Sequence, residues 1–464
     1  MSAASAPARQ RGRTLQSALR EAVRSGRLPA GTRMPSSREL AADLGVSRGL
    51  VTEAYEQLAA EGYLRAGRGA GTWVRGAGTW VGGATRAAAR EARDLAPRAP
   101  GVRYDFRPGT PDLSLFPRTA WASTHRSVLG SLPHHALGYP DPRGLPELRT
   151  ALAGLLTRRR GVVADPERLL VCSGVAQAMT LLGFVLRERG QVNAGVEDPG
   201  SPEHAALFAS AGVTAVPLPL DAGGLATGPL YDSGVRAVVT TPAHQFPLGI
   251  GYSAERRAEL LGWARAVDGL VVEDDYDGDF RYDRAPVGAL QGLDPEHVAY
   301  TGSVSKSLAP GLRLGWLLVP AHPTDELVER KRTMDLGNPA IDQALLAAFV
   351  RSGGYDRQLR RCQRVYQERR EALTASLAEC FPGAGVSGIA AGLHAIVRLP
   401  GRYGPEPVFL KRADRAGVAV RPLSDYDATG GAQDGSVRLV LGYAHLAPSA
   451  SAHGVRLMAG AARP

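Results

Sequence analysis

Apolar runs with strand chemistry alternate with helical stretches from Tyr104 onward, and this alternation limits the fold more than any other feature of the chain. The strand-like runs include RLLVCSG, AVVTTP, GLVVEDD and VAYTGS, and the helical stretches include SPEHAALFASAG and AERRAELLGWARAV. Such an alternation favours a layered α/β domain with a mostly parallel sheet. Ligands of these sheets bind beyond the carboxyl ends of the strands, so polar residues that directly follow the runs are candidate site residues.

The chain is too long for one hydrophobic core. Its 464 residues exceed the ~250–300 at which single cores stop growing, so at least two domains are expected. No apolar run approaches the ~20 residues of a membrane span, and the N-terminal MSAASAPARQRGR lacks the apolar middle of a signal peptide. We therefore expect a cytoplasmic protein without a membrane partner. The three widely spaced cysteines fit neither a disulfide framework nor a zinc pattern, and no metal site is predicted.

The stretch SSRELAADLGVSRGLVTEAYEQLAAEGYL predicts a helix, a short turn and a second helix. Ser36 or Ser37 is placed to cap the first helix, and Ser47 to cap the second. Leu40 and Leu44 are expected to face inward from the first helix. A Pro- and Gly-rich loop precedes this pair of helices, and an earlier helix is predicted before the loop.

The second of these helices opens with small polar and basic residues. Its predicted buried stripe leaves four residues on the outward face at its start, namely Ser47, Arg48, Gly49 and Thr52. A helix that follows a tight turn and opens in this way is how a recognition helix enters the major groove of DNA. The alternative is a small helical bundle with a basic face. The following GYLRAGRGAGTWV favours DNA binding, because its Gly-rich basic tip and Thr-Trp-Val return strand predict a β-hairpin wing.

This stretch resembles the winged helix-turn-helix of GntR-type bacterial regulators over residues 14 to 74. LPAGTRMPSSRELAADLGVSR, AYEQLAAEGYL and GAGTWV carry the resemblance, in order and at the expected spacing. It implies double-stranded DNA as a partner. The resemblance implies that Ser36, Arg38 and Arg48 reach phosphates or base edges and that Gly69 lies at the wing tip. Together with Ser47 and Thr52 from the outward helix face, and Arg68 beside the tip, these are the predicted DNA-binding residues. Glu53 departs from the pattern, because relatives often carry a basic residue there, and the operator sequence is left open.

The segment RGAGTWVRGAGTWV, residues 68 to 81, is one heptapeptide written twice. The wing needs one copy, and the second falls at the end of the head, where insertions are tolerated because few contacts cross. We interpret it as a tolerated duplication, with an extended wing as the alternative. The next 22 residues lack an apolar stripe and predict a flexible linker. The expected domains are a DNA-binding domain at 1–81, a linker at 82–103 and a large domain at 104–464.

Lysine is rare in this chain. The 55 basic residues are nearly all arginine, and lysine occurs only at Lys306, Lys331 and Lys411. So strong a bias makes the net charge of +10 weak evidence for nucleic acid. It also makes each lysine a candidate for a specific chemical role, because arginine does not form a Schiff base.

The motif SVSKSLAPGLRLG surrounds the first of these lysines. Lys306 is a potential imine-forming amine, and the hydroxyls of Ser303 and Ser305 flank it. Arg313, seven residues further on, supplies a guanidinium suited to a phosphate. Together these groups predict a site for pyridoxal 5'-phosphate.

Two further motifs support that prediction. VVEDDYDGDF alone would suggest a magnesium site or a solvated turn, but a buried carboxylate beside the lysine would keep the ring nitrogen of the cofactor protonated. We assign this role to Asp274, with Tyr276 donating to the ring's phenolic oxygen. VCSGVAQAM predicts a strand that ends before a helix, and the free amides of Val175 and Ala176 would complete the phosphate cup.

These motifs, with YDFRPGTPDLSLFP, GYPDPRG, TPAHQFPLG and SVRLVLGYA, resemble the fold-type I aminotransferase family over residues 104 to 450. Their order behind a GntR-type head is similar to that of the MocR-like regulators. The resemblance implies that Lys306 forms the Schiff base, that His244 or Gln245 lies near the ring oxygen, and that Arg438 binds a substrate carboxylate. It also implies a homodimer, because sites of this fold type are shared between two subunits.

The chain departs from these relatives after EDPG. Relatives often carry an aromatic ring at the next position and a basic side chain two residues later, to stack on the cofactor and help hold the ligand. Ser201 and Glu203 stand at those positions here. This departure predicts either a less tightly clamped cofactor or a ligand other than an ordinary anionic amino acid.

Three functions fit the sequence to different degrees. The favoured one is a transcriptional regulator whose aminotransferase-like domain senses pyridoxal phosphate or an amino-compound effector, in vitamin B6 or amino acid metabolism. The second is a working aminotransferase with a regulatory head; sensing and transamination need the same lysine, and we expect any transaminase activity to be secondary. The third, a regulator that has lost its cofactor, is disfavoured by the intact Lys306, Asp274 and Arg313.

Overall fold

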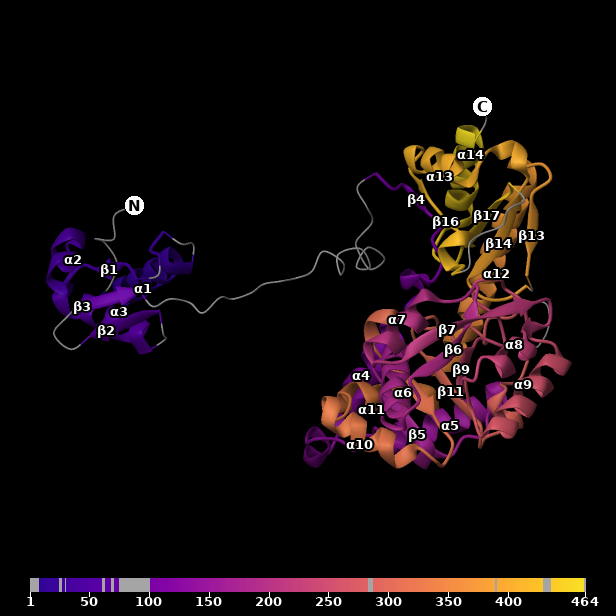
Figure 1. Ribbon diagram of the computed structural model, residues 1–464, viewed down its shortest axis with the longest axis horizontal. Helices are drawn as coiled ribbons and strands as arrows, with labels where there is room; N and C mark the ends of the chain where they lie inside the picture. Colours follow the sequence, from indigo (N-terminus) through magenta and orange to yellow (C-terminus); the bar gives the residue numbers. More distant parts are fainter. Residues whose placement is uncertain are drawn as a thin grey trace. The chain divides into compact units, whose positions relative to one another are not determined.

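The computed structural model describes residues 8–24, 27–29, 31–60, 63–67, 71–74, 101–282, 287–388, 390–428 and 435–462. The chain divides into two compact units, Met1–Pro97 and Arg98–Pro464 (Figure 1). Arg68 and Gly69, the second copy of the heptapeptide and most of the predicted linker lie outside the described residues. Within the described ranges, no helix is both long enough and apolar enough to cross a membrane.

The N-terminal unit has the helix-turn-helix and wing expected from its sequence. Its elements are α1 (Ala8–Arg24), β1 (Arg33–Met34), α2 (Ser37–Leu44), α3 (Arg48–Ala60), β2 (Leu64–Gly67) and β3 (Gly71–Val74). The three strands form an antiparallel sheet in the order β1-β3-β2. The predicted stripe of α3 is the centre of the unit's core, with Val51, Ala54 and Leu58 fully buried.

The turn between α2 and α3 is set by its caps. Ser36 and Glu39 form a reciprocal capping box at the start of α2. Gly45 ends the helix in the left-handed conformation, with φ 62°, and the Val46 amide donates to the Ala41 carbonyl. The expectation that Leu44 faces inward is wrong, because its side chain is 46% exposed. The chain turns at Gly45, and Val46 packs against the core instead.

The C-terminal unit is built on a mixed sheet of eight strands, in the order β5-β12-β11-β10-β9-β6-β7-β8. The strands of this sheet are β5 (Leu169–Cys172), β6 (Asn193–Asp198), β7 (Thr214–Asp221), β8 (Gly224–Leu225), β9 (Ala237–Thr240), β10 (Leu270–Asp274), β11 (Val298–Ser303) and β12 (Gly315–Leu318). The central pairs are parallel, and β12 and β8 run against their neighbours. The mostly parallel α/β sheet predicted from the alternation is confirmed.

Helices cover both faces of this sheet. They are α5 (Pro146–Arg160), α6 (Val175–Glu188), α7 (Pro202–Ser210), α8 (Thr227–Asp232), α9 (Ala254–Val267), α10 (Thr324–Asp335), α11 (Ala340–Arg351) and α12 (Gly354–Cys380), and α4 (Arg118–Ser131) packs against α11. Side chains of α6, α7 and α10 pack on one face. Those of α8 and α9, and separately of α5, α11 and α12, pack on the other. The result is three layers with the sheet in the middle.

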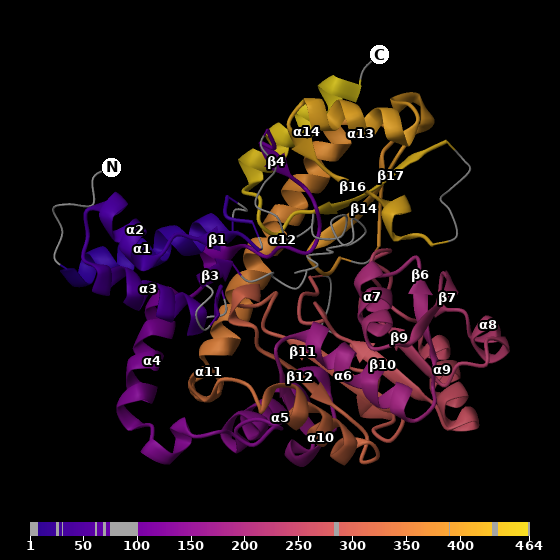
Figure 2. The same cartoon turned by 60° about the vertical axis from the view of Figure 1, so that its left-hand side comes forward.

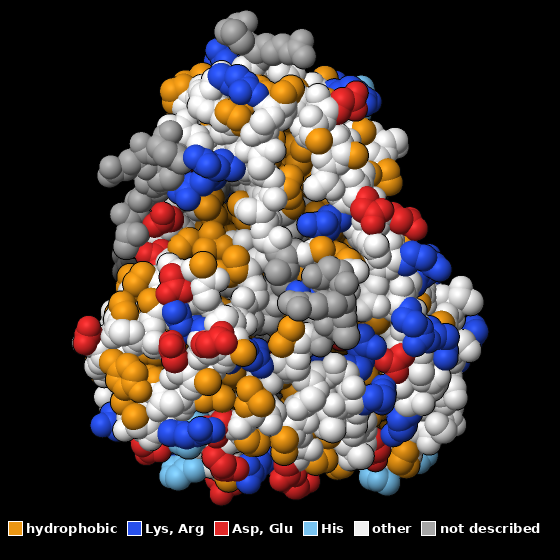
Figure 3. Space-filling model, turned by 90° about the vertical axis from the view of Figure 1, so that its right-hand side faces the viewer, with side chains coloured by type: hydrophobic (Ala, Val, Ile, Leu, Met, Phe, Trp, Pro, Cys, Tyr) orange, Lys and Arg blue, Asp and Glu red, His pale blue; other side chains and the backbone are white. Residues whose placement is uncertain are grey.

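A smaller lobe follows α12, which runs diagonally between the large sheet and this lobe (Figure 2). Its elements are β13 (Gly385–Ser387), β14 (His394–Leu399), α13 (Glu406–Arg415), β15 (Val418–Ala419), β16 (Arg421–Pro422), β17 (Val437–Gly442) and α14 (Pro448–Ala462), and β4 (Tyr104–Asp105) pairs with β15. Four of these strands form a sheet in the order β13-β14-β17-β16. On the face in Figure 3, basic and acidic side chains are interspersed among apolar ones.

Candidate functional site

Polar side chains gather beyond the carboxyl ends of three strands of the large sheet. Asp198 ends β6, Asp274 ends β10 and Ser303 ends β11. These three strands run parallel to one another, so their ends lie at one edge. That edge is where a layered α/β domain presents its ligand site.

Lys306 lies in the turn after β11, and its side chain is half-buried. The Nζ atom donates a hydrogen bond of 2.5 Å to the carbonyl oxygen of Gly109, which belongs to the segment that leads into α4. Burial lowers the pKa of Lys306, although the nearby carboxylates of Asp277, Glu203 and Asp274 act in the opposite direction. A lowered pKa makes the neutral, nucleophilic amine more abundant than on an exposed lysine.

Asp274 is buried, and among the described residues only one of its two carboxylate oxygens has a hydrogen-bond partner. His204, from α7, hydrogen-bonds to its Oδ2 atom through Nε2 at 3.0 Å. Burial alone would lower the pKa of His204. The hydrogen bond to Asp274 and the charge of that carboxylate raise the pKa by more, so the pKa is raised overall. Asp274 Oδ1 has no hydrogen-bond partner in the part of the chain that the structure describes. A buried unpartnered oxygen costs about 1–3 kcal/mol, so a donor from a ligand would be favoured here.

The predicted phosphate cup comes together from two distant motifs. Gly174 precedes α6 without a side-chain cap, so the amides of Val175 and Ala176 are open at the helix start. Arg313 donates from Nη2 to the Ser173 carbonyl, and a Cβ on Gly174 would lie 2.8 Å from that same Nη2. Ser303 pairs in register with Gly315, which in turn pairs with Cys172 and so joins the two motifs across β12.

The sequence leaves His244 and Gln245 as alternatives for the group near the ring oxygen. In the structure, Gln245 is bonded within its own turn. The Gln245 side chain is fully buried and donates to the Glu197 carboxylate and to the carbonyls of Pro199 and Phe246, while it accepts from the Leu248 amide. Its hydrogen-bonding capacity is thereby used within the turn. His244 is left as the candidate for the ring oxygen.

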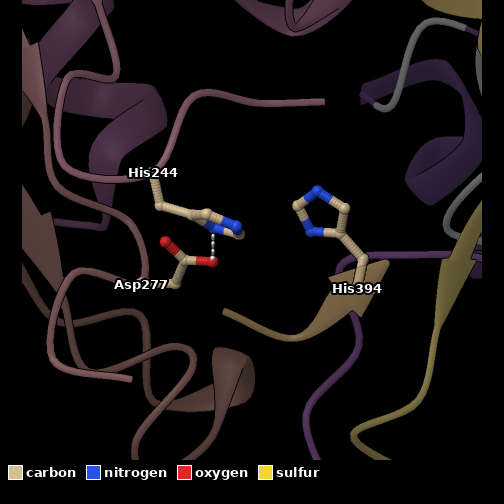
Figure 4. Close-up of side chains that lie close together, drawn as sticks. All are labelled: His244, Asp277 and His394. Atoms are coloured by element: carbon tan, nitrogen blue, oxygen red, sulfur yellow. Dashed lines mark hydrogen bonds and ion pairs between the residues drawn. The ribbon is translucent and has the colours of Figure 1, made fainter. Parts of the chain in front are cut away.

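His244 belongs to a buried network with Asp277 and His394 (Figure 4), and the half-buried Tyr276 lies beside it. Its Nδ1 atom lies 2.9 Å from Asp277 Oδ2 and 3.1 Å from the Tyr276 hydroxyl. Burial and the Asp277 carboxylate raise the pKa of Tyr276 well above its ordinary value, so this hydroxyl keeps its proton. Burial and the neighbouring His244 lower the pKa of His394 to about 3, so its imidazole is neutral.

The same network has the composition of a metal site. One ligand atom from each of His244, Asp277 and His394 lies within 4.8 Å of the others. However, His244 Nδ1 is engaged with Asp277, and His394 Nε2 donates to the Pro247 carbonyl at 3.0 Å. We therefore interpret His244 and Asp277 as a hydrogen-bonded pair beside Tyr276, with the ring of His394 packed near that of His244.

Arg438 lies in β17, opposite Arg398 of β14. In the same pairing, Gly442 of β17 stands opposite His394, at the end of the strand that faces the buried network. Four residues of strand separate the two positions, about 13 Å. The role of Arg438 at a substrate carboxylate stays a prediction.

The departure after EDPG lies at the start of α7. The Ser201 hydroxyl donates to Glu203 Oε2 at 2.6 Å, so the two unusual residues bind each other. His204 follows directly and contacts Asp274, which places this helix start next to the candidate cofactor site. The carboxylate of Glu203 is therefore close enough to favour the charged form of Lys306.

Two of the arginines predicted to contact DNA lie among the described residues of the N-terminal unit. Arg38 and Arg48 are exposed, and Arg48 Nε lies 3.4 Å from the Ser37 hydroxyl. The hydroxyls of Ser36 and Ser47 are engaged in capping the amides of Glu39 and Leu50, and the Thr52 hydroxyl donates to the Arg48 carbonyl at 3.0 Å. These three hydroxyls thus have structural bonds that fix the start of each helix.

Several residues of the site were not predicted from the sequence. His204 and His394 lie outside the quoted site motifs, and Asp277 lies within VVEDDYDGDF but was given no role, because each meets its partner only in the folded chain. The position of His204 just after EDPG, beyond the end of β6, is a signal that could have singled it out. A histidine within the apolar stretch that contains His394 is more often an ordinary core residue.

Comparisons with known proteins agree with the two units. The family of bacterial regulatory proteins named gntR matches residues 12–74, and aminotransferase class I and II matches residues 114–449. The chain is 32% identical to the HTH-type pyridoxine biosynthesis transcriptional regulator PdxR of Corynebacterium glutamicum, over 90% of this chain and 89% of that protein. It is 33% identical to the protein named "Probable rhizopine catabolism regulatory protein MocR" of Rhizobium meliloti, over 96% of this chain and 92% of the relative.

A solved structure is similar to the C-terminal unit. The kynurenine aminotransferase of Pyrococcus horikoshii, crystallised with PMP, superposes with a TM-score of 0.71 at 25% identity. The match covers 81% of this chain and 94% of that enzyme. The fold-type I assignment is thereby confirmed.

Proposed function

This chain belongs to the GntR-type transcriptional regulators that carry a class I and II aminotransferase domain, and we propose that pyridoxal phosphate held at Lys306 controls its binding to DNA. The fold family of the C-terminal unit uses this cofactor. The effector is the cofactor itself or an amino compound that reacts with it, in vitamin B6 or amino acid metabolism. We place the protein in the cytoplasm, with double-stranded DNA as its partner.

The observation that carries this proposal is the meeting of three groups at one sheet edge. Lys306 offers a half-buried amine of lowered pKa, Asp274 a buried oxygen without a partner among the described residues, and Arg313 a guanidinium beside open helix amides. An amine, a carboxylate for a ring nitrogen and a phosphate cup are the groups that pyridoxal phosphate needs. The fit supports retention of the cofactor in this regulator.

Each residue has a separate task in the proposal. When bound, pyridoxal phosphate supplies an aldehyde that condenses with amines and a ring that draws electron density. Asp274, held by His204, keeps a proton at the ring nitrogen, and Tyr276 donates its hydroxyl proton toward the ring oxygen. The amides of Val175 and Ala176, with Ser303, Ser305 and Arg313, neutralise the phosphate.

We further propose that the protein acts as a homodimer. Exposed apolar side chains are frequent along the chain before α5 and directly after α10: Leu113, Leu129, Leu137, Tyr139 and Leu336 are 46–87% exposed. A Cβ on Gly337 would lie 2.9 Å from Pro140, so the last two of these positions are close in space. Large apolar side chains left in solvent together are typical of a protein interface. A symmetric dimer would present two heads to a two-fold DNA site.

The experiment is a spectrum of the purified protein after incubation with pyridoxal phosphate. We expect the visible absorbance of a cofactor joined to a lysine, and we expect Lys306→Ala to abolish it. Lys411→Ala is the matched control, because Lys411 is an exposed lysine of α13. Identical colourless spectra for the wild type and both variants would contradict the proposal.

A further inference from the structure

Lys331 is a fully buried lysine that the proposed function leaves without a task. It lies in α10, its side chain is 0% exposed, and it is one of only three lysines in the sequence. Its Nζ atom donates to Asp335 Oδ2 and to Asn338 Oδ1, both at 2.7 Å. Burying a full charge is unfavourable unless its partners are fixed in place, so this position is specified by the groups that the ammonium binds.

Both partners of Lys331 reach the residue that begins the phosphate cup. Asn338 Nδ2 donates to the Ser173 hydroxyl at 2.8 Å. Asp335 Oδ2 accepts from Gln177 Nε2 at 2.6 Å, and Gln177 Oε1 in turn accepts the Ser173 amide at 2.7 Å. Two routes of hydrogen bonds therefore run from one ammonium group to the two donor groups of Ser173.

These bonds engage the amide, the hydroxyl oxygen and the carbonyl of Ser173. The amide donates to Gln177, the hydroxyl oxygen accepts from Asn338, and the carbonyl accepts from Arg313. The following amides, at Val175 and Ala176, are left open at the start of α6. Gln177 lies in that same first turn, so the network fixes both the entry of the chain and the helix that carries the open amides.

A compact ammonium suits this position better than the arginine that prevails elsewhere in the chain. Asp335 Oδ2 and Asn338 Oδ1 are bound from a single nitrogen atom, whereas a guanidinium would present a planar fork of several donors. The use of a rare lysine here agrees with a requirement for one small donor.

We propose that Lys331 is a positioning residue for the phosphate cup, and that it selects the phosphorylated form of the cofactor by holding Ser173, Gln177 and the first turn of α6 in a phosphate-binding geometry. This inference rests on the proposed function, because it concerns the same cofactor site. Lys331 does not touch the ligand; it acts through Asn338, Asp335 and Gln177.

The test compares two ligands that differ only in the phosphate. Dissociation constants of pyridoxal 5'-phosphate and of pyridoxal are measured by absorbance titration for the full-length wild type, Lys331→Met, Gln177→Leu and Lys411→Met. In the wild type, the phosphorylated ligand binds more tightly. We expect Lys331→Met and Gln177→Leu to lower this preference by about tenfold or more, which is the effect of one hydrogen bond to a charged group.

Binding of pyridoxal is expected to change little in these variants, because its aldehyde and ring meet Lys306 and Asp274, which the network does not contact. Lys411→Met keeps the wild-type preference. A general loss of structure would instead weaken both ligands in parallel, so the ratio of the two constants separates positioning from stability. Gln177→Leu removes a half-buried side chain and gives the answer if Lys331→Met does not fold.

Each outcome is decisive. An unchanged ratio in a folded Lys331→Met, or in Gln177→Leu where that variant alone folds, overturns the inference and leaves the proposed function standing. A parallel loss of both ligands also overturns it. Failure of the wild type to bind pyridoxal phosphate overturns the proposed function and this inference with it.

Discussion

At the scale of single residues, the environment of Lys306 makes a prediction about pH. Burial lowers its pKa from the ordinary value of 10.5, so the neutral amine appears at lower pH than on an exposed lysine. The rate at which pyridoxal phosphate attaches to the cofactor-free protein should rise with pH and level off below pH 10.5. Stopped-flow absorbance, recorded at a series of pH values up to 10.5, measures this rate.

The carboxylate of Asp277 shifts that profile in a defined direction. It favours the charged form of Lys306, so Asp277→Asn should move the midpoint of the rate profile to lower pH. Asp268→Asn is the control, because Asp268 is exposed and caps α9 in a left-handed conformation that asparagine also adopts. A midpoint that stays in place, or moves upward, in Asp277→Asn would contradict this electrostatic account.

The sequence singled out some residues of the site and missed others for a physical reason. Lys306 and Arg313 share one motif, and their chemistry is legible from residue type and spacing. The bond between His204 and Asp274 joins residues 70 positions apart, and the network from Lys331 reaches Ser173 from another layer of the fold. Contacts of this kind depend on how helices pack, which a local pattern does not contain.

At the scale of elements, α3 is the element on which DNA binding depends. Arg48 is exposed at its first position, where a recognition helix meets the groove. Arg48→Ala should weaken binding to the regulator's own upstream DNA by ~1–3 kcal/mol and lower the salt slope by about one if the contact is to a phosphate. Gel shifts at several salt concentrations measure both quantities.

The control for this prediction is Arg351→Ala, which removes an exposed arginine from α11. The visible spectrum of the cofactor should be the same in both variants, since neither side chain belongs to the site. Equal affinity of Arg48→Ala and the wild type for DNA at every salt concentration would contradict the assignment of the start of α3 to the DNA interface.

Elements were predicted better than their ends. The period of the apolar residues in α3 and the apolar runs of β10 and β11 gave the correct element types, because burial on one or both faces leaves a strong pattern. Leu44 was placed wrongly because the turn at Gly45, not the helical period, decides which side chain covers the end of α2.

At the scale of the whole molecule, the exposed apolar side chains predict the oligomeric state. Leu137→Glu should put a charge into the proposed dimer face and raise the dimer dissociation constant at least tenfold, because a buried unpaired charge is costly. Leu293→Glu is a matched control, since both leucines are 60% exposed. Sedimentation at micromolar concentration should give a dimer for the wild type and Leu293→Glu, and a monomer for Leu137→Glu. A monomeric wild type would contradict the proposal.

The effect of the cofactor site in one unit on DNA binding by the other unit has to be measured. A ligand shifts DNA binding only if it binds two states of the protein with different affinity. Lys306 lies in one unit and Arg48 in the other, so any effect of the cofactor on the DNA is a coupling between two distinct sites.

The most direct measurement of that coupling is a footprint on the DNA upstream of the regulator's own gene, with and without pyridoxal phosphate. The account predicts that adding pyridoxal phosphate to the wild type changes the protected region or the protein concentration needed to protect it. Lys306→Ala should bind the same DNA with no response to the cofactor. Wild-type footprints that are identical with and without pyridoxal phosphate would contradict the claim that chemistry at Lys306 controls the binding of DNA.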